Sequence, residues 1–195
     1  DPAIDHGHIA RYVAERGRSV GLVDVVPAGS LTLGRRGETM AHIDELWDAG
    51  VRMFTDDGDS VADASLLRLV MEYIAQLGGV VSQHAVDPHL SGAGFMHEGA
   101  VSSRLGMYGI PSEADEIVIA RDLRLAALTG VRYHVQHLST AASVEMIATA
   151  AERGVAVTCE VTPHHLSFTE EDVEGTDPLE VEIDEECNRI VVLRQ

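Results

Sequence analysis

The stretch "DASLLRLVMEYIAQLGGVVSQHA" (63–85) carries two different hydrophobic patterns, one on each side of a glycine pair. A buried strand in a parallel sheet is typically a continuous Val-rich run, and the run after the glycines has this character. Before the glycines, apolar residues recur at the three- and four-residue spacing of an amphipathic helix: Leu66, Leu67, Val70, Met71, Ile74 and Leu77. The stretch therefore predicts a helix followed directly by a buried strand.

The same alternation extends in both directions from this unit. Apolar runs predict strands at 19–28, 51–55, 80–85, 131–139 and 155–163, and periodic segments predict helices at 38–50, 63–79, 111–130 and 141–154. Helices alternating with continuous strands indicate parallel β-α units. We therefore expect an α/β protein of about five units, which form either a doubly wound sheet or part of a β/α barrel.

Composition limits the classes of partner. The chain has a net charge of −18, and its 14 basic residues are all arginine. Such an acidic chain is poorly suited to bind nucleic acid or anionic lipid. No signal peptide is visible in the sequence, and no apolar run approaches the ~18 residues that a membrane helix needs. The two cysteines form no C-x-x-C motif, so we expect a reduced, cytoplasmic location and a small-molecule substrate.

Polar side chains that can bind metal recur where the predicted strands end. Asp56 and Asp57 follow the strand at 51–55, and His84 closes the next strand. His137 closes the strand after the loop at 86–111, with His134 three residues before it, and His164 and His165 follow the strand at 155–163. The carboxyl ends of parallel strands share one face of a β/α protein, so these side chains should meet there. Aspartate and histidine are zinc ligands. A single D-D-G is usually a turn and a lone histidine is usually structural, but three at corresponding strand ends favour a metal site.

Five segments resemble dihydroorotase of the longer bacterial type, a member of the amidohydrolase superfamily. They are "FTDDG" (54–58), "HEG" (97–99), "GIPSEADEIVIARD" (109–122), "YHVQHLST" (133–140) and "EVTPHHL" (160–166). The resemblance implies a TIM barrel of the metal-dependent hydrolase type with two zinc ions per site. It also implies the reversible interconversion of N-carbamoyl-L-aspartate and (S)-dihydroorotate in pyrimidine biosynthesis.

The resemblance further implies individual ligands in this sequence. Asp57 matches the metal-bridging aspartate of the family, and His84 and His137 match the next two ligands. His134 is then expected to be structural. Related hydantoinases and allantoinases generally use a carboxylated lysine as the bridge, and this sequence has no lysine. An allantoinase- or hydantoinase-like hydrolase remains an alternative.

Several family segments have no counterpart here. The family has an H-x-H pair and an arginine on its first strand and a D-H-A-P segment that carries the general base. "HGH" (6–8) imitates the pair but begins a segment of helical spacing, so His6 and His8 are not expected to bind the metal. We therefore expect an incomplete barrel domain at 1–178, an atypical acidic tail at 179–195, and unknown catalytic and substrate-binding residues.

These differences affect the expected activity. The chain could bind one zinc ion rather than two, and these 195 residues alone are expected to hydrolyse dihydroorotate negligibly. The alternative is that the chain is not an enzyme but an inactive fragment, or a non-catalytic β/α subunit that pairs with another chain. A homo-oligomer is also possible.

The loop at 86–111 is expected to lie over the metal face, or else to be a disordered insertion. Glu116 and Arg121 are expected to be structural.

Overall fold

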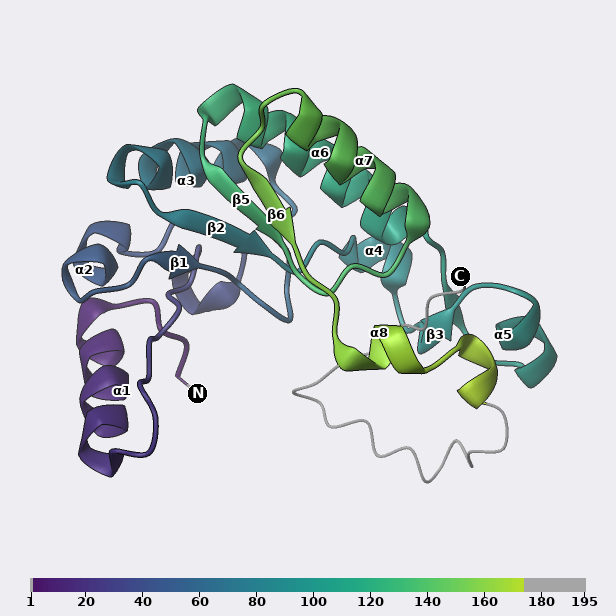
Figure 1. Cartoon of the computed structure of the whole chain (residues 1–195), viewed down its shortest axis with the longest axis horizontal. Coiled ribbons are helices and arrows are strands. Elements are labelled where there is room, and N and C mark those ends of the chain that lie inside the picture. The colour runs from purple at the N-terminus through teal and green to yellow at the C-terminus, as the bar shows by residue number, and fades with distance from the viewer. Residues whose placement is uncertain (1, 174–195) are drawn as a thin grey trace.

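A parallel four-stranded sheet forms the centre of the computed structural model, which describes residues 2–173 (Figure 1). The strand order is β1-β2-β5-β6, and each neighbouring pair is parallel. The strands are β1 (Met53–Phe54), β2 (Val80–Gln83), β5 (Arg132–Val135) and β6 (Val157–Cys159). A separate parallel pair consists of β3 (Met96–His97) and β4 (Gly109–Ile110). The α/β class with a parallel sheet is therefore confirmed.

The helices that follow the strands lie along one face of the sheet, where α3 contacts α6 and α6 contacts α7 (Figure 1). The α-helices are α1 (Gly7–Val20), α2 (Ile43–Asp48), α3 (Ala64–Leu77), α4 (Pro88–Ser91), α5 (Ala100–Leu105), α6 (Glu113–Thr129), α7 (Ala141–Glu152) and α8 (Pro163–Ser167). Short 3-10 helices occur at η1 (Leu33–Arg35) and η2 (Glu170–Val173). The helix expected at 38–50 is therefore shorter than its sequence pattern suggested.

Helix α3 forms where the periodicity predicted it. The Asp63 carboxylate accepts hydrogen bonds from the backbone N–H groups of Ser65 and Leu66, at 2.7 and 3.2 Å, which caps the first turn. Gly78 ends the helix with a left-handed φ of 76°, a conformation that glycine adopts without a Cβ penalty. Strand β2 then begins at Val80, so the helix-then-strand unit is confirmed.

The core lies between the sheet and these helices. Phe54, Val81 and Tyr133 occupy successive register positions across β1, β2 and β5, and all three are buried. The Tyr133 hydroxyl donates to the buried Asp122 carboxylate of α6 at 2.9 Å, and Gln83 Nε2 donates to the same oxygen at 3.1 Å. This network connects α6 to two central strands, since a buried carboxylate needs such donors.

Arg121 extends this network to the segment before α3. Its Nε donates to Asp122 at 2.7 Å, and its two terminal nitrogens donate to the backbone carbonyls of Val61 and Ala62 at 2.9 and 2.8 Å. The planar guanidinium suits this forked arrangement. Arg121 therefore has a structural role, as the sequence analysis expected.

The strand predicted at 19–28 is wrong. Helix α1 continues to Val20, and the only strand-like contact nearby is a bridge between Gly29 and Phe54 of β1. Leu22 and Val23 are 84% and 71% exposed. A Val-rich run makes a strand only when a neighbouring strand pairs with it. Within residues 2–173 nothing pairs with this run along its length, so four of the five expected strands form the sheet.

The segment at 86–111 is not a structureless loop. It contains α4, β3, α5 and β4, and its α4 contacts α6. Figure 1 shows β3 and α5 extending beyond the sheet, near α8. None of the described helices is both long and apolar enough to span a bilayer. The acidic tail expected at 179–195 lies outside the described residues.

Candidate metal centre

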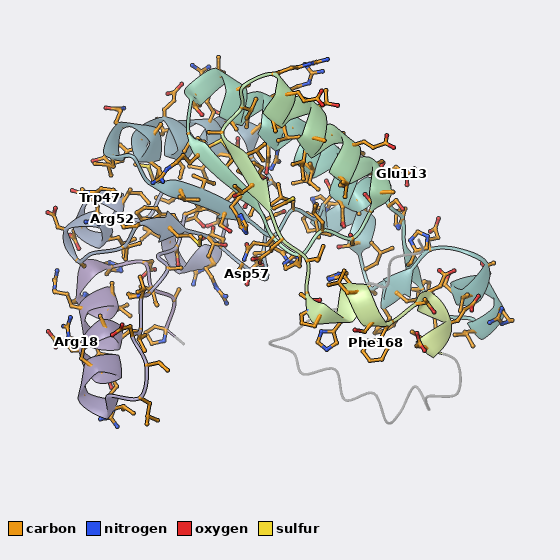
Figure 2. All side chains as sticks on the ribbon, in the orientation of Figure 1. Arg18, Trp47, Arg52, Asp57, Glu113 and Phe168 are labelled. Atoms are coloured by element: carbon orange, nitrogen blue, oxygen red, sulfur yellow. The ribbon has the colours of Figure 1, made fainter. Side chains whose placement is uncertain are left out.

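Three side chains converge at the carboxyl-terminal edge of the sheet. Asp57 follows β1, His84 follows β2 directly, and His137 lies two residues after β5. Asp57 is labelled at this edge in Figure 2. Among residues 2–173 they are the one group of three or more His, Cys, Asp or Glu residues whose ligand atoms all lie within 4.8 Å of one another. The structure therefore brings together all three residues that the sequence analysis selected.

The distances within this group suit a metal ion. Asp57 Oδ1 lies 3.7 Å from His84 Nδ1 and 3.6 Å from His137 Nε2, and the two histidine nitrogens are 3.0 Å apart. Zn–N distances of ~2.0–2.1 Å place two ligands of a tetrahedron roughly 3.3–3.4 Å apart. The observed distances fall on both sides of this value. The donor set of one carboxylate and two imidazoles fits zinc.

The electrostatics of the group favour a ligating aspartate. The close approach of His137 lowers the pKa of Asp57, and the positive charges of His84 and His137 add to this effect, whereas burial opposes it. For His137, burial alone would lower the pKa, but the interaction with the Asp57 carboxylate outweighs it and raises the pKa. The Asp57 carboxylate is thus stabilised in the ionised form that binds metal.

His137 has an unusual backbone conformation. Its φ is +35°, which is uncommon for a residue other than glycine. The neighbouring residues are anchored, because the Gln136 N–H donates to the Gln83 carbonyl at 3.2 Å and the Leu138 N–H donates to the Glu160 backbone carbonyl at 2.8 Å. Such strained backbone conformations persist where contacts with the surrounding residues hold them in place, and they cluster at functional sites.

Asp56 has a different environment from its neighbour Asp57. It is 1% exposed, and its Oδ1 accepts hydrogen bonds from the backbone N–H groups of Leu31 and Thr32 at 2.8 and 3.1 Å. Its Oδ2 accepts from the Thr32 hydroxyl. Burial raises the pKa of Asp56, although these hydrogen bonds act against it. Asp56 therefore secures the segment at 31–32, which leaves Asp57 for the metal group.

The other histidines highlighted by the sequence lie outside the group. His134 Nδ1 is 2.8 Å from the Thr158 hydroxyl and its Nε2 is 3.3 Å from Glu160. His6 and His8 lie at the start of α1, where the His6 and His42 rings are tilted relative to each other with centroids 4.7 Å apart. None of these three histidines belongs to the group of Asp57, His84 and His137.

His165 is close enough to His137 for their charges to interact. Its Nδ1 is 2.7 Å from the hydroxyl of Thr162, the residue that precedes α8. Burial lowers the pKa of His165, and the positive charge of His137 contributes to the shift. The "TPHH" segment therefore places an imidazole within electrostatic range of His137.

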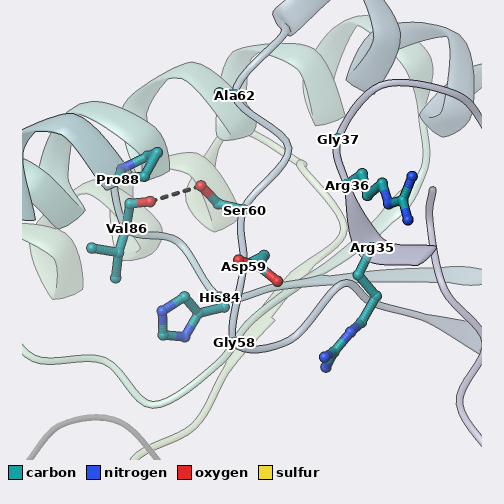
Figure 3. A pocket seen from close by; sticks show the side chains of 10 residues that line it. All are labelled: Arg35, Arg36, Gly37, Gly58, Asp59, Ser60, Ala62, His84, Val86 and Pro88. Carbon is teal, nitrogen blue, oxygen red and sulfur yellow. Dashed lines mark hydrogen bonds between the residues drawn. The ribbon is translucent and has the colours of Figure 1, made fainter. Parts of the chain in front are cut away.

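A cavity of about 250 Å³ adjoins the group, with His84 in its wall (Figure 3). Arg35, Arg36 and Asp59 supply charged groups to the lining, and the remaining lining residues are Gly37, Gly58, Ser60, Ala62, Val86 and Pro88. Arg35 also donates from a terminal nitrogen to the Asp57 carbonyl at 3.0 Å. The cavity thus offers space next to His84 for a small molecule.

Two polar residues around the group escaped the sequence analysis. Thr55 and Gln136 form a hydrogen bond of 3.1 Å across 81 residues of sequence. Each lies within two residues of a selected ligand, which is the one signal in the sequence that could have drawn attention to them. Their partners depend on how the strands are arranged, which spacing does not reveal.

Comparison with known proteins identifies the family. A family model described as dihydro-orotase-like matches residues 1–143. The chain belongs to this family. Dihydroorotase from Pelotomaculum thermopropionicum is 45% identical over 176 residues, which are 90% of this chain and 41% of that protein. Dihydroorotase from Deinococcus radiodurans is 44% identical over 178 residues, covering 91% of this chain and 43% of that protein.

The chain thus spans about two fifths of the length of these family members. Solved structures support the fold. L-hydantoinase (dihydropyrimidinase) from Arthrobacter aurescens matches with a TM-score of 0.66 at 21% identity, covering 88% of this chain and 40% of that one. D-hydantoinase from a Bacillus species matches with a TM-score of 0.58 at 22% identity, covering 77% and 35%. At these identities the likeness concerns the fold alone.

Proposed function

We propose that this chain forms part of a dihydroorotase, which interconverts N-carbamoyl-L-aspartate and (S)-dihydroorotate in pyrimidine biosynthesis. The convergence of Asp57, His84 and His137 at the carboxyl-terminal strand edge carries the proposal. The family membership and the dihydroorotase relatives at 44–45% identity support the choice of substrate.

In this proposal Asp57, His84 and His137 bind zinc. Two zinc ions per site are expected from the family resemblance, and this group supplies ligands for at least one. A bound zinc ion polarises a carbonyl oxygen and lowers the pKa of water. The ionised Asp57 carboxylate has two oxygens and suits a bridging position. The cavity beside His84 is the proposed place for the cyclic amide.

The proposed architecture is an arc of a TIM barrel. The strand order β1-β2-β5-β6 follows the chain, without the reversal that marks a doubly wound sheet. Helices α3, α6 and α7 lie on the same face of the sheet, as they do around a barrel (Figure 1). An incomplete barrel of four paired strands in the described region accounts for both features.

A hydantoinase-like hydrolase is the second candidate, because the solved structures with similar folds include hydantoinases. The composition argues against it. The sequence contains no lysine, so a carboxylated lysine cannot bridge two metals here. The aspartate-bridged centre is therefore the better-supported reading.

The proposal also includes a cytoplasmic location, in line with the absence of C-x-x-C motifs in the sequence. It also includes self-association into a homo-oligomer. The mass of the purified chain in solution tests this part.

A chimeric enzyme tests the function directly. Residues 2–173 would replace the matching segment of the Pelotomaculum thermopropionicum dihydroorotase, which is 45% identical over 176 residues. The chimera is expected to hydrolyse dihydroorotate in a zinc-dependent manner, and Asp57→Asn should abolish this activity. Asp48→Asn is the matched control, because Asp48 is an exposed carboxylate at the end of α2, outside both the metal group and the cavity.

Two outcomes would contradict the proposal. A folded chimera that binds no zinc would favour the non-catalytic β/α subunit. A chimera that hydrolyses hydantoin or allantoin in preference to dihydroorotate would favour the second candidate. Metal content by elemental analysis and substrate consumption by chromatography distinguish these results.

A further inference from the structure

Gln136 contacts the ends of all three strands that carry the proposed metal ligands. It precedes His137 directly, and its backbone N–H donates to the carbonyl of Gln83 at 3.2 Å. Gln83 in turn precedes His84 directly. The Gln136 side-chain oxygen Oε1 accepts a hydrogen bond from the Thr55 hydroxyl at 3.1 Å. One half-buried residue therefore connects the segments of His84, His137 and, through Thr55, Asp57.

Thr55 completes the connection to Asp57. The Asp57 backbone N–H donates to the Thr55 hydroxyl oxygen at 3.0 Å. The hydroxyl has one proton to donate, which it gives to Gln136, and it accepts from Asp57 at the same time. The Thr55 backbone N–H donates to the Gly29 carbonyl at 2.7 Å, which fixes the strand end. The orientation of the Asp57 backbone thus depends on the hydrogen bond between Thr55 and Gln136, and Gln136 is the residue before His137.

We infer that Gln136 and Thr55 are positioning residues that set the spacing of Asp57, His84 and His137 for metal binding. This inference rests on the proposed function, because it assigns the three residues as ligands. Neither Gln136 nor Thr55 belongs to the ligand group itself, so both act through the ligands.

The geometry explains why this spacing needs support. Metal–ligand distances must lie within about 0.2 Å of their ideal values, so the three strand ends must be held in fixed positions relative to one another. The strands themselves end before the proposed ligands, at Phe54 in β1, Gln83 in β2 and Val135 in β5. The Gln136–Thr55 bond adds a cross-connection beyond these ends. It also stabilises the segment in which His137 adopts its positive φ.

Paired substitutions at Thr55 separate positioning from packing. Thr55→Val removes the hydroxyl but keeps the branched shape, whereas Thr55→Ser keeps the hydroxyl. Zinc affinity of the 195-residue chain would be measured by competition with a chromophoric chelator. We expect Thr55→Val to weaken zinc binding roughly 10- to 100-fold, the range typical of partners that orient metal ligands. Thr55→Ser is expected to retain the wild-type affinity.

Gln136 provides an independent test. Gln136→Leu removes the acceptor, and Gln136→Asn keeps an amide that is too short to reach Thr55, while both leave the backbone bond to Gln83 in place. Both are expected to weaken zinc binding as Thr55→Val does. The double variant of Thr55→Val and Gln136→Leu should bind zinc no more weakly than either single variant, since both remove the same bond.

Thr158→Val is the matched control. The Thr158 hydroxyl also bonds to a strand side chain, His134, in the same sheet, but it does not connect to the ligands. This variant is expected to bind zinc like the wild type. Melting temperatures would be measured for every variant, because a purely structural role lowers the melting temperature without changing zinc affinity.

The possible results decide the inference. Wild-type zinc affinity in folded Thr55→Val and Gln136→Asn variants would overturn it while leaving the proposed function intact. If the wild-type chain binds no zinc, or if Asp57→Asn binds zinc as tightly as the wild type, both this inference and the proposed function are overturned. If Thr55→Val does not fold, Gln136→Asn and the retained affinity of Thr55→Ser still decide the question.

Discussion

Asp56 and Asp57 are neighbours in the sequence, yet their carboxylates bind different parts of the protein. Asp56 accepts hydrogen bonds from the backbone of Leu31 and Thr32, whereas Asp57 Oδ1 lies 3.6 Å from His137 Nε2. Two adjacent carboxylates would repel each other if they shared one environment. Here backbone N–H donors stabilise the charge of the Asp56 carboxylate. Two histidines, together with a proposed zinc ion, stabilise the charge of the Asp57 carboxylate.

This division predicts opposite phenotypes for the two aspartates. Asp57→Asn should lose zinc binding with little change in stability, because the side chain is half-exposed. Asp56→Ala should be destabilised by about 1–3 kcal/mol for each buried N–H group that it leaves without an acceptor. Urea unfolding and zinc titration of both variants check this. Loss of stability in Asp57→Asn comparable to that in Asp56→Ala would contradict it.

Asp122 predicts a pH-dependent contribution to stability. Burial raises the pKa of this carboxyl above its ordinary value of 3.8, although the charge of Arg121 and hydrogen bonds from Gln83 and Tyr133 oppose the shift. A raised pKa means that the folded state binds the proton more tightly than the unfolded state. The contribution of Asp122 is therefore fully present below pH 3.8 and is lost as the pH rises through the folded pKa.

Asp122→Asn removes this titration and provides the measurement. The unfolding free energy of the wild type minus that of the variant should fall as the pH rises from about 4 towards neutrality. Urea unfolding at a series of pH values gives this difference. A difference that grows with pH would show that the ion pair with Arg121 outweighs burial.

Arg121 is predicted to affect stability but not zinc binding. Its guanidinium donates to the carbonyls of Val61 and Ala62 and to Asp122, and Arg121→Lys cannot reproduce this fork. We expect a loss of about 1–3 kcal/mol of unfolding free energy, since buried acceptors lose their donors. Zinc affinity should match the wild type. A selective loss of zinc affinity at unchanged stability would assign Arg121 to the site.

The 195 residues alone are predicted to hydrolyse dihydroorotate negligibly. The printed sequence contains no D-H-A-P segment to supply the general base that the family resemblance implies. General acid–base assistance is typically worth 10²–10⁴-fold in rate. The measurement is carbamoyl-aspartate formation by the zinc-loaded chain. Rapid turnover that Asp57→Ala abolishes would show that residues of this chain or a second copy supply the missing group.

Local signals in the sequence were sufficient for α3, α6 and α7 and for the central strands. The spacing in 63–79 predicted α3, because side chains three and four residues apart share one face of a helix. The region of the proposed metal ligands was also accessible to sequence reasoning. Parallel strands place their carboxyl ends at one edge, which indicated this face of the protein. The family resemblance then selected Asp57, His84 and His137, which the structure brings together.

Only the tertiary structure decided which segments pair and which polar groups meet. The Val-rich run at 19–28 has strand character but lacks a partner strand in the described region, and pairing depends on distant residues. The roles of Asp56 and Gln136 likewise depend on the loop at 31–32 and on Thr55, which is 81 residues from Gln136 in the sequence. Hydrogen bonds join groups that folding brings within about 3 Å, and sequence separation does not encode that distance.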